Sequence, residues 1–294
     1  MSPNPDGTIT WRELLGETTE RLRAAGVDAA EAEARRLVGE ASGAERDLAL
    51  VLSDRATERG VARLDTMVGR RCAGEPLQYA LGAWGFRTLD LMVDRRVLIP
   101  RPETETVVEV ALAELDLLGG RELPTTVVDL GTGSGAIALS IATERVRTEV
   151  WATDVDEDSL AVARANLSGI GRAASRVTMT SGSWFEALPE RLRGQVHLIV
   201  SNPPYVPAGA SLPAEVAEWE PVGALYSGPD GTDDLRELIA GAGEWLVDGG
   251  VLVCELSPEQ APAMVDLAGE HFESARVEAD LTGRDRALVA RRPR

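Results

Sequence analysis

The sequence contains no lysine, so its 30 basic residues are all arginines, and 48 acidic residues outnumber them. The formal net charge is −18 at pH 7, and most of it lies in residues 76–294, which hold 19 arginines against 34 acids. The electrostatic field of so acidic a protein repels phosphate backbones. Neutralisation of those backbones by basic residues supplies most of the non-specific affinity of proteins for nucleic acid. The charge therefore disfavours a bare RNA or DNA substrate and favours a basic protein partner.

Cysteine and long apolar runs are also scarce. Cys72 and Cys254 are the only cysteines, and their wide separation argues against a disulfide framework or a zinc site. No apolar run approaches the roughly 18 residues that cross a bilayer. The first residues lack the charged start and the apolar core of a signal peptide. We therefore expect a cytoplasmic monomer with no membrane partner and no bound metal.

Hydrophobic periodicity divides the 294 residues into three regions. Residues 1–75 carry apolar positions at helical spacing, with Asp28 as a candidate cap, and predict a small helical bundle. Residues 76–100 predict a hairpin linker, and from residue 101 strand and helix patterns alternate, which indicates a parallel α/β sheet. Strands are expected at Thr125–Leu130, Glu149–Asp154, Arg176–Ser181, His197–Ser201, Val251–Glu255, Ser274–Asp280 and Arg286–Ala290, and helices at Glu45–Leu52, Glu103–Leu118, Ala136–Glu144, Asp158–Leu167 and Asp233–Leu246.

A glycine-rich turn, Gly131–Gly135, follows the first strand of the third region. Glycine lets the backbone turn tightly and lets a ligand approach the main chain, and ligands of open parallel sheets sit beyond the carboxyl ends of the strands. The next strand ends in Asp154, whose carboxylate can accept both hydroxyl hydrogens of a ribose. The pattern predicts a nucleotide-like cofactor held by Gly131, Thr132, Gly133, Ser134, Gly135 and Asp154.

Two cofactors suit this turn. With the spacing G-x-G-x-x-A it also fits a dinucleotide, whose pyrophosphate would lie on the helix N-terminus. Asp129, just before the glycines, would face a cationic amino or sulfonium group well and a pyrophosphate badly. Asp129 therefore favours S-adenosylmethionine, and a nicotinamide-dependent oxidoreductase is the alternative.

The most specific chemical signal is the segment Ser-Asn-Pro-Pro-Tyr at 201–205. A primary amide nitrogen is a poor nucleophile because its lone pair is delocalised into the carbonyl group. The side-chain oxygen of Asn202 and the backbone carbonyl of Pro203 can hold both N–H groups of such an amide. Pro204 stiffens the segment, and Tyr205 offers a flat face to a planar group. The segment predicts methyl transfer to a planar nitrogen through orientation, without a general base.

Other readings of these residues remain open. Trp184, after the third strand, can stack on an adenine ring or fill the core. The segment 201–205 also suits an exocyclic nitrogen of a flipped DNA or RNA base, but that reading predicts a basic groove. A cofactor-binding or partner-binding module without catalysis is a further alternative.

The order of these segments resembles the release factor glutamine methyltransferases (PrmC/HemK). The resemblance rests on Gly74–Tyr79, Leu98–Glu105, Asp129–Ala138 and Asn202–Tyr205, and it covers nearly the whole chain. Ile99–Glu105 is its most discriminating part, because many amino-methyltransferases share Asn-Pro-Pro-Tyr but lack this segment.

The resemblance implies a class I S-adenosylmethionine-dependent methyltransferase with a Rossmann-like α/β sheet over residues 101–294. A β-hairpin linker, 76–100, would join it to an N-terminal helical domain, 1–75, that recognises the substrate. The activity implied is N5-methylation of the glutamine in the Gly-Gly-Gln motif of class I peptide chain release factors, in translation termination. By position, the implied cofactor residues are Gly131, Thr132, Gly133, Ser134, Gly135, Asp154, Trp184 and Asn202, and the implied glutamine-binding or catalytic residues are Asn202, Pro203, Pro204 and Tyr205.

Three positions depart from the family pattern. Ser183 stands where the family usually has Asp, Ser257 replaces a usual glycine, and Leu91 stands where an aromatic residue is common. These departures leave the residues implied in methyl transfer unchanged.

Overall fold

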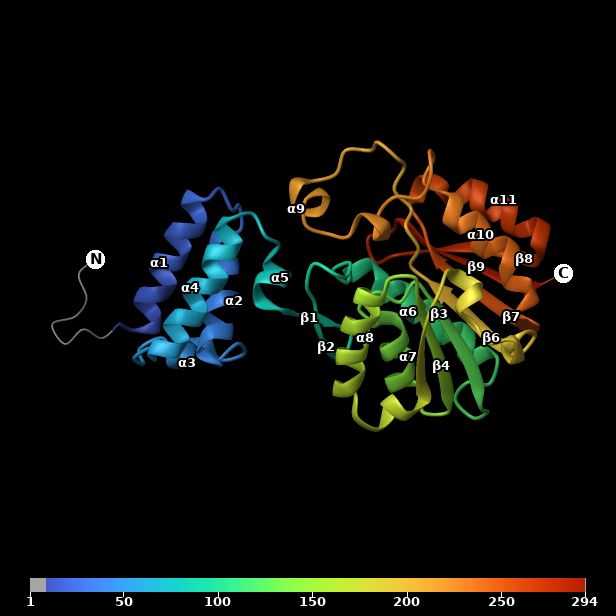
Figure 1. Cartoon of the computed structure of the whole chain (residues 1–294), viewed down its shortest axis with the longest axis horizontal. Coiled ribbons are helices and arrows are strands. Elements are labelled where there is room, and N and C mark those ends of the chain that lie inside the picture. Colours follow the sequence, from blue (N-terminus) through green and yellow to red (C-terminus); the bar gives the residue numbers. More distant parts are fainter. Residues whose placement is uncertain (1–8, 294) are drawn as a thin grey trace. The chain divides into compact units, whose positions relative to one another are not determined.

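The structure, a computed structural model, describes residues 9–293 and comprises two compact units (Figure 1). The first unit contains the chain up to Gly82 together with Pro213–Trp219, and the second contains Ala83–Leu212 and the chain from Glu220 onward. The expected linker 76–100 is divided between the two units. The first eight residues of the expected bundle and the last residue of the expected catalytic region lie outside the described residues.

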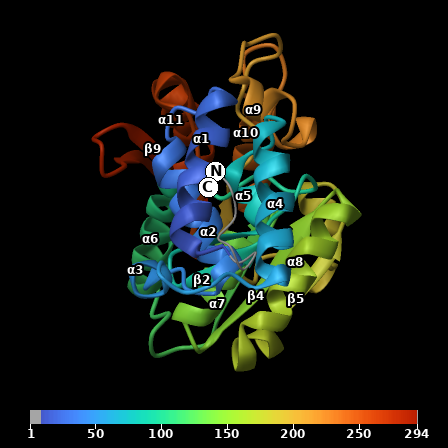
Figure 2. The same ribbon diagram turned by 90° about the vertical axis from the view of Figure 1, so that its left-hand side faces the viewer.

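The first unit is a bundle of helices, namely α1 (Trp11–Ala24), α2 (Ala30–Ser42), α3 (Leu48–Val51), α4 (Glu58–Cys72), α5 (Leu77–Leu81) and α9 (Ala214–Ala217). Helices α1, α2 and α4 lie side by side (Figure 1, Figure 2) and enclose a core that includes Trp11, Leu22 and Leu37. Thr10 and Glu13 form a capping box that satisfies two backbone N–H groups at the start of α1. The predicted helical bundle is confirmed.

Two details of the bundle differ from the prediction. Asp28 does not cap the second helix, because α2 begins only at Ala30 and its cap position, Ala29, makes no side-chain hydrogen bond. Acidic residues in the first turn of α2 place negative charge at the helix N-terminus instead, where the backbone dipole favours it. The helix expected over Glu45–Leu52 is shortened to α3, because the chain turns through residues 45–47 first.

The second unit begins with an antiparallel hairpin of β1 (Ala83–Phe86) and β2 (Leu89–Met92) and continues into a seven-stranded sheet. The sheet has the order β5-β4-β3-β6-β7-β9-β8. Its strands are β3 (Thr125–Leu130), β4 (Thr148–Asp154), β5 (Val177–Ser181), β6 (Val196–Ser201), β7 (Leu246–Glu255), β8 (Phe272–Ala279) and β9 (Asp285–Pro293). Strands β3 to β7 pair in parallel, and β9 pairs antiparallel with β7 and β8. The predicted α/β sheet with its hairpin is confirmed.

Helices cover both faces of this sheet. Helices α6 (Pro102–Leu117), α7 (Ala136–Glu144) and α8 (Glu157–Gly169) lie on one face, and α10 (Asp233–Gly241) and α11 (Ala261–His271) on the other. Consecutive residues of a central strand divide between the two cores, so that Val127 joins one and Val128 the other. Burial on both faces explains why the central strands read as continuous apolar runs.

The helix expected over Asp233–Leu246 is wrong at its C-terminal end. Helix α10 ends at Gly241, a 3-10 turn spans Ala242–Glu244, and β7 begins at Leu246. Gly241 lies so close to Phe185 that an added Cβ would be 2.6 Å from its ring. Leu246 is buried and pairs with Val196 at the start of β7, so the chain leaves the helix before it.

Among residues 9–293 no helix is both long and apolar enough to cross a membrane.

Candidate active site

A cavity of about 440 Å³ lies at the carboxyl ends of the parallel strands β3, β4 and β6. Ligands of open parallel sheets bind at this edge. The predicted site residues that line the cavity are Gly131, Thr132, Gly133, Ser134, Asp154, Trp184, Asn202 and Pro204. The sheet topology thus brings together segments that are far apart in the sequence. Gly135, Pro203 and Tyr205 do not line the cavity among the described residues.

The glycine turn has the conformation that its composition requires. Gly131 has a φ of +73°, and a Cβ added to it would lie 3.2 Å from the ring of Trp184. Any larger residue at 131 would therefore be strained and would press against the cavity wall. Gly135, with a φ of +86°, occupies the N-cap position of α7 and directs the chain into that helix.

Asp154 connects the end of β4 to the glycine turn. One carboxylate oxygen accepts a hydrogen bond from the backbone N–H of Gly133 at 2.8 Å, and the other accepts from the N–H of Asp156 at 3.0 Å. Burial raises the pKa of Asp154, although hydrogen bonds from the backbone N–H groups of Asp156, Gly133 and Val155 lower it. The carboxylate lines the cavity with acceptor capacity to spare, as a ribose diol requires.

Asp129 does not occupy the position expected of it. Its side chain is 0% exposed and does not line the cavity, so the expectation that it faces a cofactor cation is corrected. One oxygen accepts hydrogen bonds from the hydroxyl of Thr132 at 2.6 Å and the N–H of Ala138 at 3.1 Å. Burial, reinforced by the charge of Asp154, raises the pKa of Asp129 to about 7. Its observed role is to brace the glycine turn from beneath.

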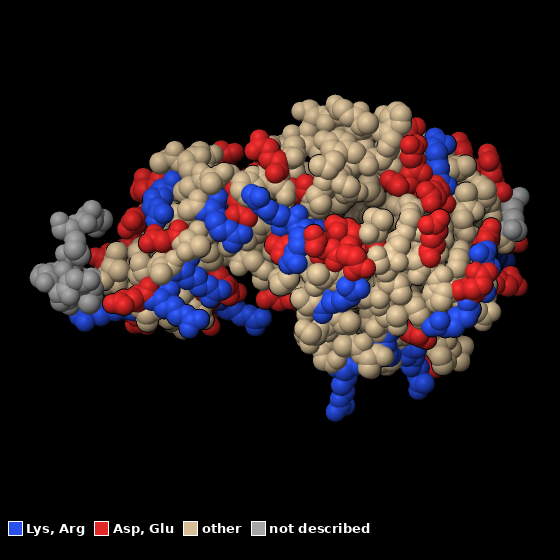
Figure 3. All heavy atoms as spheres, viewed as in Figure 1, with Lys and Arg blue, Asp and Glu red and all other residues tan. Residues whose placement is uncertain are grey.

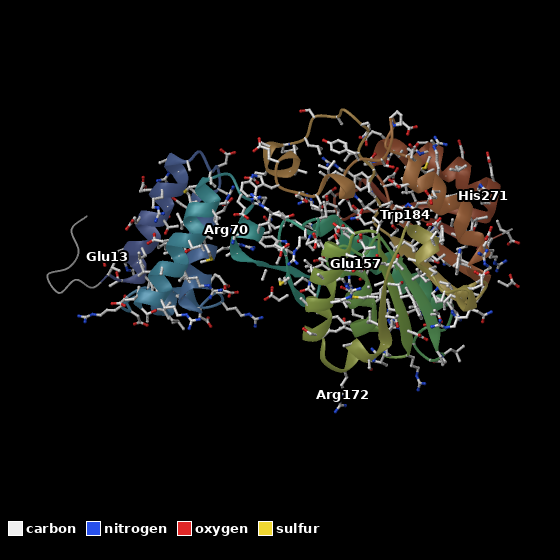
Figure 4. All side chains as sticks on the ribbon, in the orientation of Figure 1. Glu13, Arg70, Glu157, Arg172, Trp184 and His271 are labelled. Atoms are coloured by element: carbon white, nitrogen blue, oxygen red, sulfur yellow. The ribbon has the colours of Figure 1, made fainter. Side chains whose placement is uncertain are left out.

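Trp184 has a strained backbone at the edge of the cavity. It follows β5, where Figure 4 labels it, and its φ is +39°, a value that side-chain-bearing residues rarely adopt. Strain of this kind costs about 1–3 kcal/mol and persists only where the surroundings impose it. The indole ring lies against Gly131 and lines the cavity while also contacting the core on one face of the sheet.

Asn202 is held by two residues that the sequence reading missed. Its amide nitrogen donates to the Thr104 hydroxyl at 3.2 Å, and that hydroxyl donates to the Glu255 carboxylate at 2.7 Å. The Tyr205 hydroxyl donates to the other oxygen of Glu255 at 3.2 Å. A usable signal was present for Glu255, because an acid that ends an apolar strand lies at the ligand edge of the sheet. For Thr104, the only signal was its place in the segment Ile99–Glu105, which carries the family resemblance.

Tyr205 and Pro203 do not line the cavity but are next to Asn202 and Pro204, which do. Tyr205 is half-buried, and burial together with the charge of Glu255 raises the pKa of its phenol. The backbone carbonyl of Tyr205 accepts a hydrogen bond from the Gln260 side chain at 3.0 Å, which anchors the segment after β6. Pro203 is buried.

A buried ion pair holds a further wall of the cavity. Glu220 is 5% exposed and accepts hydrogen bonds from the guanidinium of Arg101 at 2.5 Å and from the backbone N–H of Ile99 at 3.3 Å. Pro100, between these two donors, lines the cavity, as does Pro221 next to Glu220. The ion pair therefore ties the segment that precedes α6 to the opposite wall.

The three departures from the family pattern occupy different environments. Ser183 lines the cavity beside Trp184. Ser257 caps a short 3-10 helix through a capping box with Gln260, the residue that anchors Tyr205. Leu91 is buried in the hairpin, opposite Trp84.

Comparison with known proteins gives the family. Residues 13–82 match the family model of the PrmC N-terminal domain, and residues 113–218 match that of the methyltransferase small domain. The hMettl16 catalytic domain, solved in complex with MAT2A 3'UTR hairpin 6, has a TM-score of 0.52 over 80% of this chain and 82% of its own. At 14% identity this similarity shows a shared fold alone.

Several relatives match over almost their full length. The release factor glutamine methyltransferase of Moorella thermoacetica is 41% identical over 97% of this chain and 99% of its own. The release factor glutamine methyltransferase of Cereibacter sphaeroides is 40% identical over 96% of this chain and 98% of its own. The chain therefore belongs to the family of release factor glutamine methyltransferases.

Proposed function

We propose that this protein transfers the methyl group of S-adenosylmethionine to the N5 nitrogen of the glutamine in the Gly-Gly-Gln motif of class I peptide chain release factors. The observation that carries the proposal is that a glycine turn, a ribose-type carboxylate and the Asn202 amide line one cavity. The names of the full-length relatives support the same substrate.

The residues present fit the proposed cofactor. Gly131 and the indole of Trp184 line the same cavity, and the absence of a side chain at Gly131 lets the indole lie against the turn, so a flat group in the cavity can contact the indole. The spare acceptor positions of Asp154 suit the two ribose hydroxyls. S-adenosylmethionine, when bound, supplies a methyl group on a sulfonium centre that an in-line nucleophile can displace.

Asn202 is proposed to orient the acceptor nitrogen. Its amide nitrogen is occupied by Thr104, so its side-chain oxygen is available to accept one N–H of the glutamine amide. The backbone carbonyl of Pro203 is proposed to accept the second N–H, and Pro204 and Tyr205 to enclose the planar group. Orientation of this kind lowers the activation free energy by up to about 7–11 kcal/mol in favourable systems. As the new N–C bond forms, the bond between sulfur and the methyl carbon breaks, the sulfur leaves as a neutral thioether, and the amide nitrogen loses one proton to solvent.

The helical first unit is proposed to recognise the release factor. The proposed division is a substrate-recognition domain over residues 1–75, a linker at 76–100 and catalysis at 101–294, and the family match over residues 13–82 supports a separate N-terminal domain. The net charge of −18 favours a basic protein partner. On the face of the second unit drawn in Figure 3, acidic and basic side chains of the described residues are interspersed, with no continuous basic groove.

The test is methyl transfer from labelled S-adenosylmethionine to a purified class I release factor and to its variant with alanine in place of the Gly-Gly-Gln glutamine. Label on the native factor and none on the variant is the expected result. A parallel reaction with single-stranded DNA and RNA serves as the control. Label on nucleic acid, with none on the release factor, would contradict the proposal.

A further inference from the structure

A line of hydrogen bonds connects Asn202, at the cavity, to a carboxylate that is 0% exposed, that of Glu255. The bonds run from the Asn202 amide nitrogen to the Thr104 hydroxyl, and from that hydroxyl to Glu255. Glu255 ends β7, the neighbour of the strand that leads into Asn202. A fully buried carboxylate is costly, so its place directly behind the acceptor site calls for an explanation.

We propose that Glu255 is a positioning residue that, through the Thr104 hydroxyl, turns the side-chain carbonyl of Asn202 toward the acceptor amide. The proposal rests on the function proposed above. It names the group that fixes which way the side-chain carbonyl of Asn202 points.

The direction follows from which groups can donate. An ionised carboxylate only accepts hydrogen bonds, so the Thr104 hydroxyl must donate its single hydrogen to Glu255. The Thr104 oxygen then has only lone pairs left for Asn202 and can bind only its NH₂ group. The Asn202 carbonyl oxygen is thereby directed away from Thr104 and is free to accept an N–H of the substrate.

Protonation of Glu255 would remove this constraint. A neutral carboxyl group can donate to Thr104, whose hydrogen is then released to the Asn202 carbonyl. The Asn202 amide would rotate and present its NH₂ group to the NH₂ group of the glutamine. Two donors would then face each other, and the acceptor would be lost.

The surroundings of Glu255 allow its charge to change near neutral pH. The titratable and charged groups that face it are Glu103 from α6, Tyr205 after β6, and Arg286 from β9. Arg286 pairs with Asp280 at 3.3 Å, and within residues 9–293 Glu255 forms no ion pair of its own. Burial raises the pKa of Glu255 to about 7, with Arg286 opposing and Glu103 reinforcing the effect.

The experiment is the pH dependence of single-turnover methyl transfer to a class I release factor, from about pH 5.5 to 9. We expect the wild-type rate constant to fall about tenfold for each pH unit below about 7, as the ionised form of Glu255 is depleted. Glu255→Gln should be about tenfold to hundredfold slower at pH 8, because the acceptor is misplaced, and should show no inflection near pH 7. Affinity for S-adenosylmethionine, measured by calorimetry, shows that each variant is folded.

Matched variants separate positioning from general damage. Thr104→Ser keeps the hydroxyl and should retain the rate and the pH profile, whereas Thr104→Val should be slow and without the inflection. Glu114→Gln removes another buried carboxylate from the same helix as Thr104, one that pairs with Arg276 and Arg291, and should keep the wild-type profile.

Two failures are distinguishable. If wild-type protein labels no release factor at any pH, the proposed function is overturned. If it labels the factor but Glu255→Gln keeps the inflection near pH 7, the titrating group lies elsewhere, with Asp129 the first candidate, and the positioning role is overturned.

Discussion

The carboxylate of Asp154 accepts a hydrogen bond from the backbone N–H of Gly133, with 2.8 Å between oxygen and nitrogen. The bond ties the end of β4 to the turn after the neighbouring strand β3, so one side chain both shapes the turn and faces the cavity. A carboxylate offers about four acceptor positions. Backbone N–H groups, among them those of Gly133 and Asp156, use some of them, and the carboxylate also lines the cavity, where it can accept from a ligand.

Replacing Asp154 tests whether its carboxylate binds the cofactor as well as shaping the turn. Asp154→Ala should weaken binding of S-adenosylmethionine about tenfold to hundredfold, since hydrogen bonds to a charged group contribute about 1.5–3 kcal/mol each. Isothermal titration calorimetry measures the change directly. Asp158→Ala, an exposed acid four residues further on, is the matched control and should bind normally. An unchanged affinity in Asp154→Ala would mean that the ribose binds elsewhere.

Asn202 should affect the methyl-transfer step and not the binding of cofactor. Asn202→Ala removes the oxygen that orients the acceptor amide, and loss of one preorganised group of this kind costs about 10²–10³ in rate. We therefore expect kcat to fall by that factor while the affinity for S-adenosylmethionine stays close to that of the wild type. Rapid-quench transfer assays and calorimetry on the same preparation measure both quantities. Activity equal to the wild type would contradict the orientation mechanism.

Much of the second unit could be predicted from sequence, because its signals are local. The strand at Thr125–Leu130 and the helix at Ala136–Glu144 have the predicted bounds, since an apolar run and a glycine turn mark them directly. The end of α10 at Gly241 could not be predicted. It depends on the pairing of Leu246 with Val196 in the sheet, a contact between residues distant in sequence.

Most of the site residues predicted from the sequence line the cavity, whereas the contacts behind the lining could not be predicted. Asp154 and Asn202 come directly after strands, so the parallel topology alone places them at one edge. The position of Asp129 was misjudged because its side chain turns inward to Thr132 and Ala138, a contact that no spacing reveals. The link from Asn202 to Glu255 was missed for the same reason, because it depends on a hydroxyl from α6.

The ion pair of Arg101 and Glu220 should contribute to stability through its burial. Glu220→Ala leaves a partly buried guanidinium without its partner, and breaking a buried pair in this way costs about 3–5 kcal/mol. Arg101→Met combined with Glu220→Leu should cost less than Glu220→Ala alone, because no charge is left unpaired. Urea unfolding of Arg101→Met, of Glu220→Leu and of the double variant gives the coupling energy. Costs that simply add would show that the pair does not act as a unit.

The buried carboxylate of Glu255 should make stability fall as pH rises. Its pKa is about 7 in the folded protein and near its ordinary value of 4.5 in the unfolded chain, so the folded state binds more protons between these two pH values. At about 1.4 kcal/mol for each pH unit, the wild type should lose on the order of 3 kcal/mol relative to Glu255→Gln between about pH 4.5 and 7.

Urea unfolding of the wild type and of Glu255→Gln at several pH values measures this difference. Asp129 also titrates near pH 7, but it is present in both proteins and cancels from the difference. Below about pH 4.5 and above about pH 7 the difference should stop changing, because Glu255 then carries the same charge in the folded and unfolded chains. A difference that stays constant across the whole range would show that Glu255 keeps an ordinary pKa, and an activity inflection near pH 7 would then need another group. If the difference grows as expected, the carboxylate that orients Asn202 does so at a cost in stability, because its charge is buried in the folded protein.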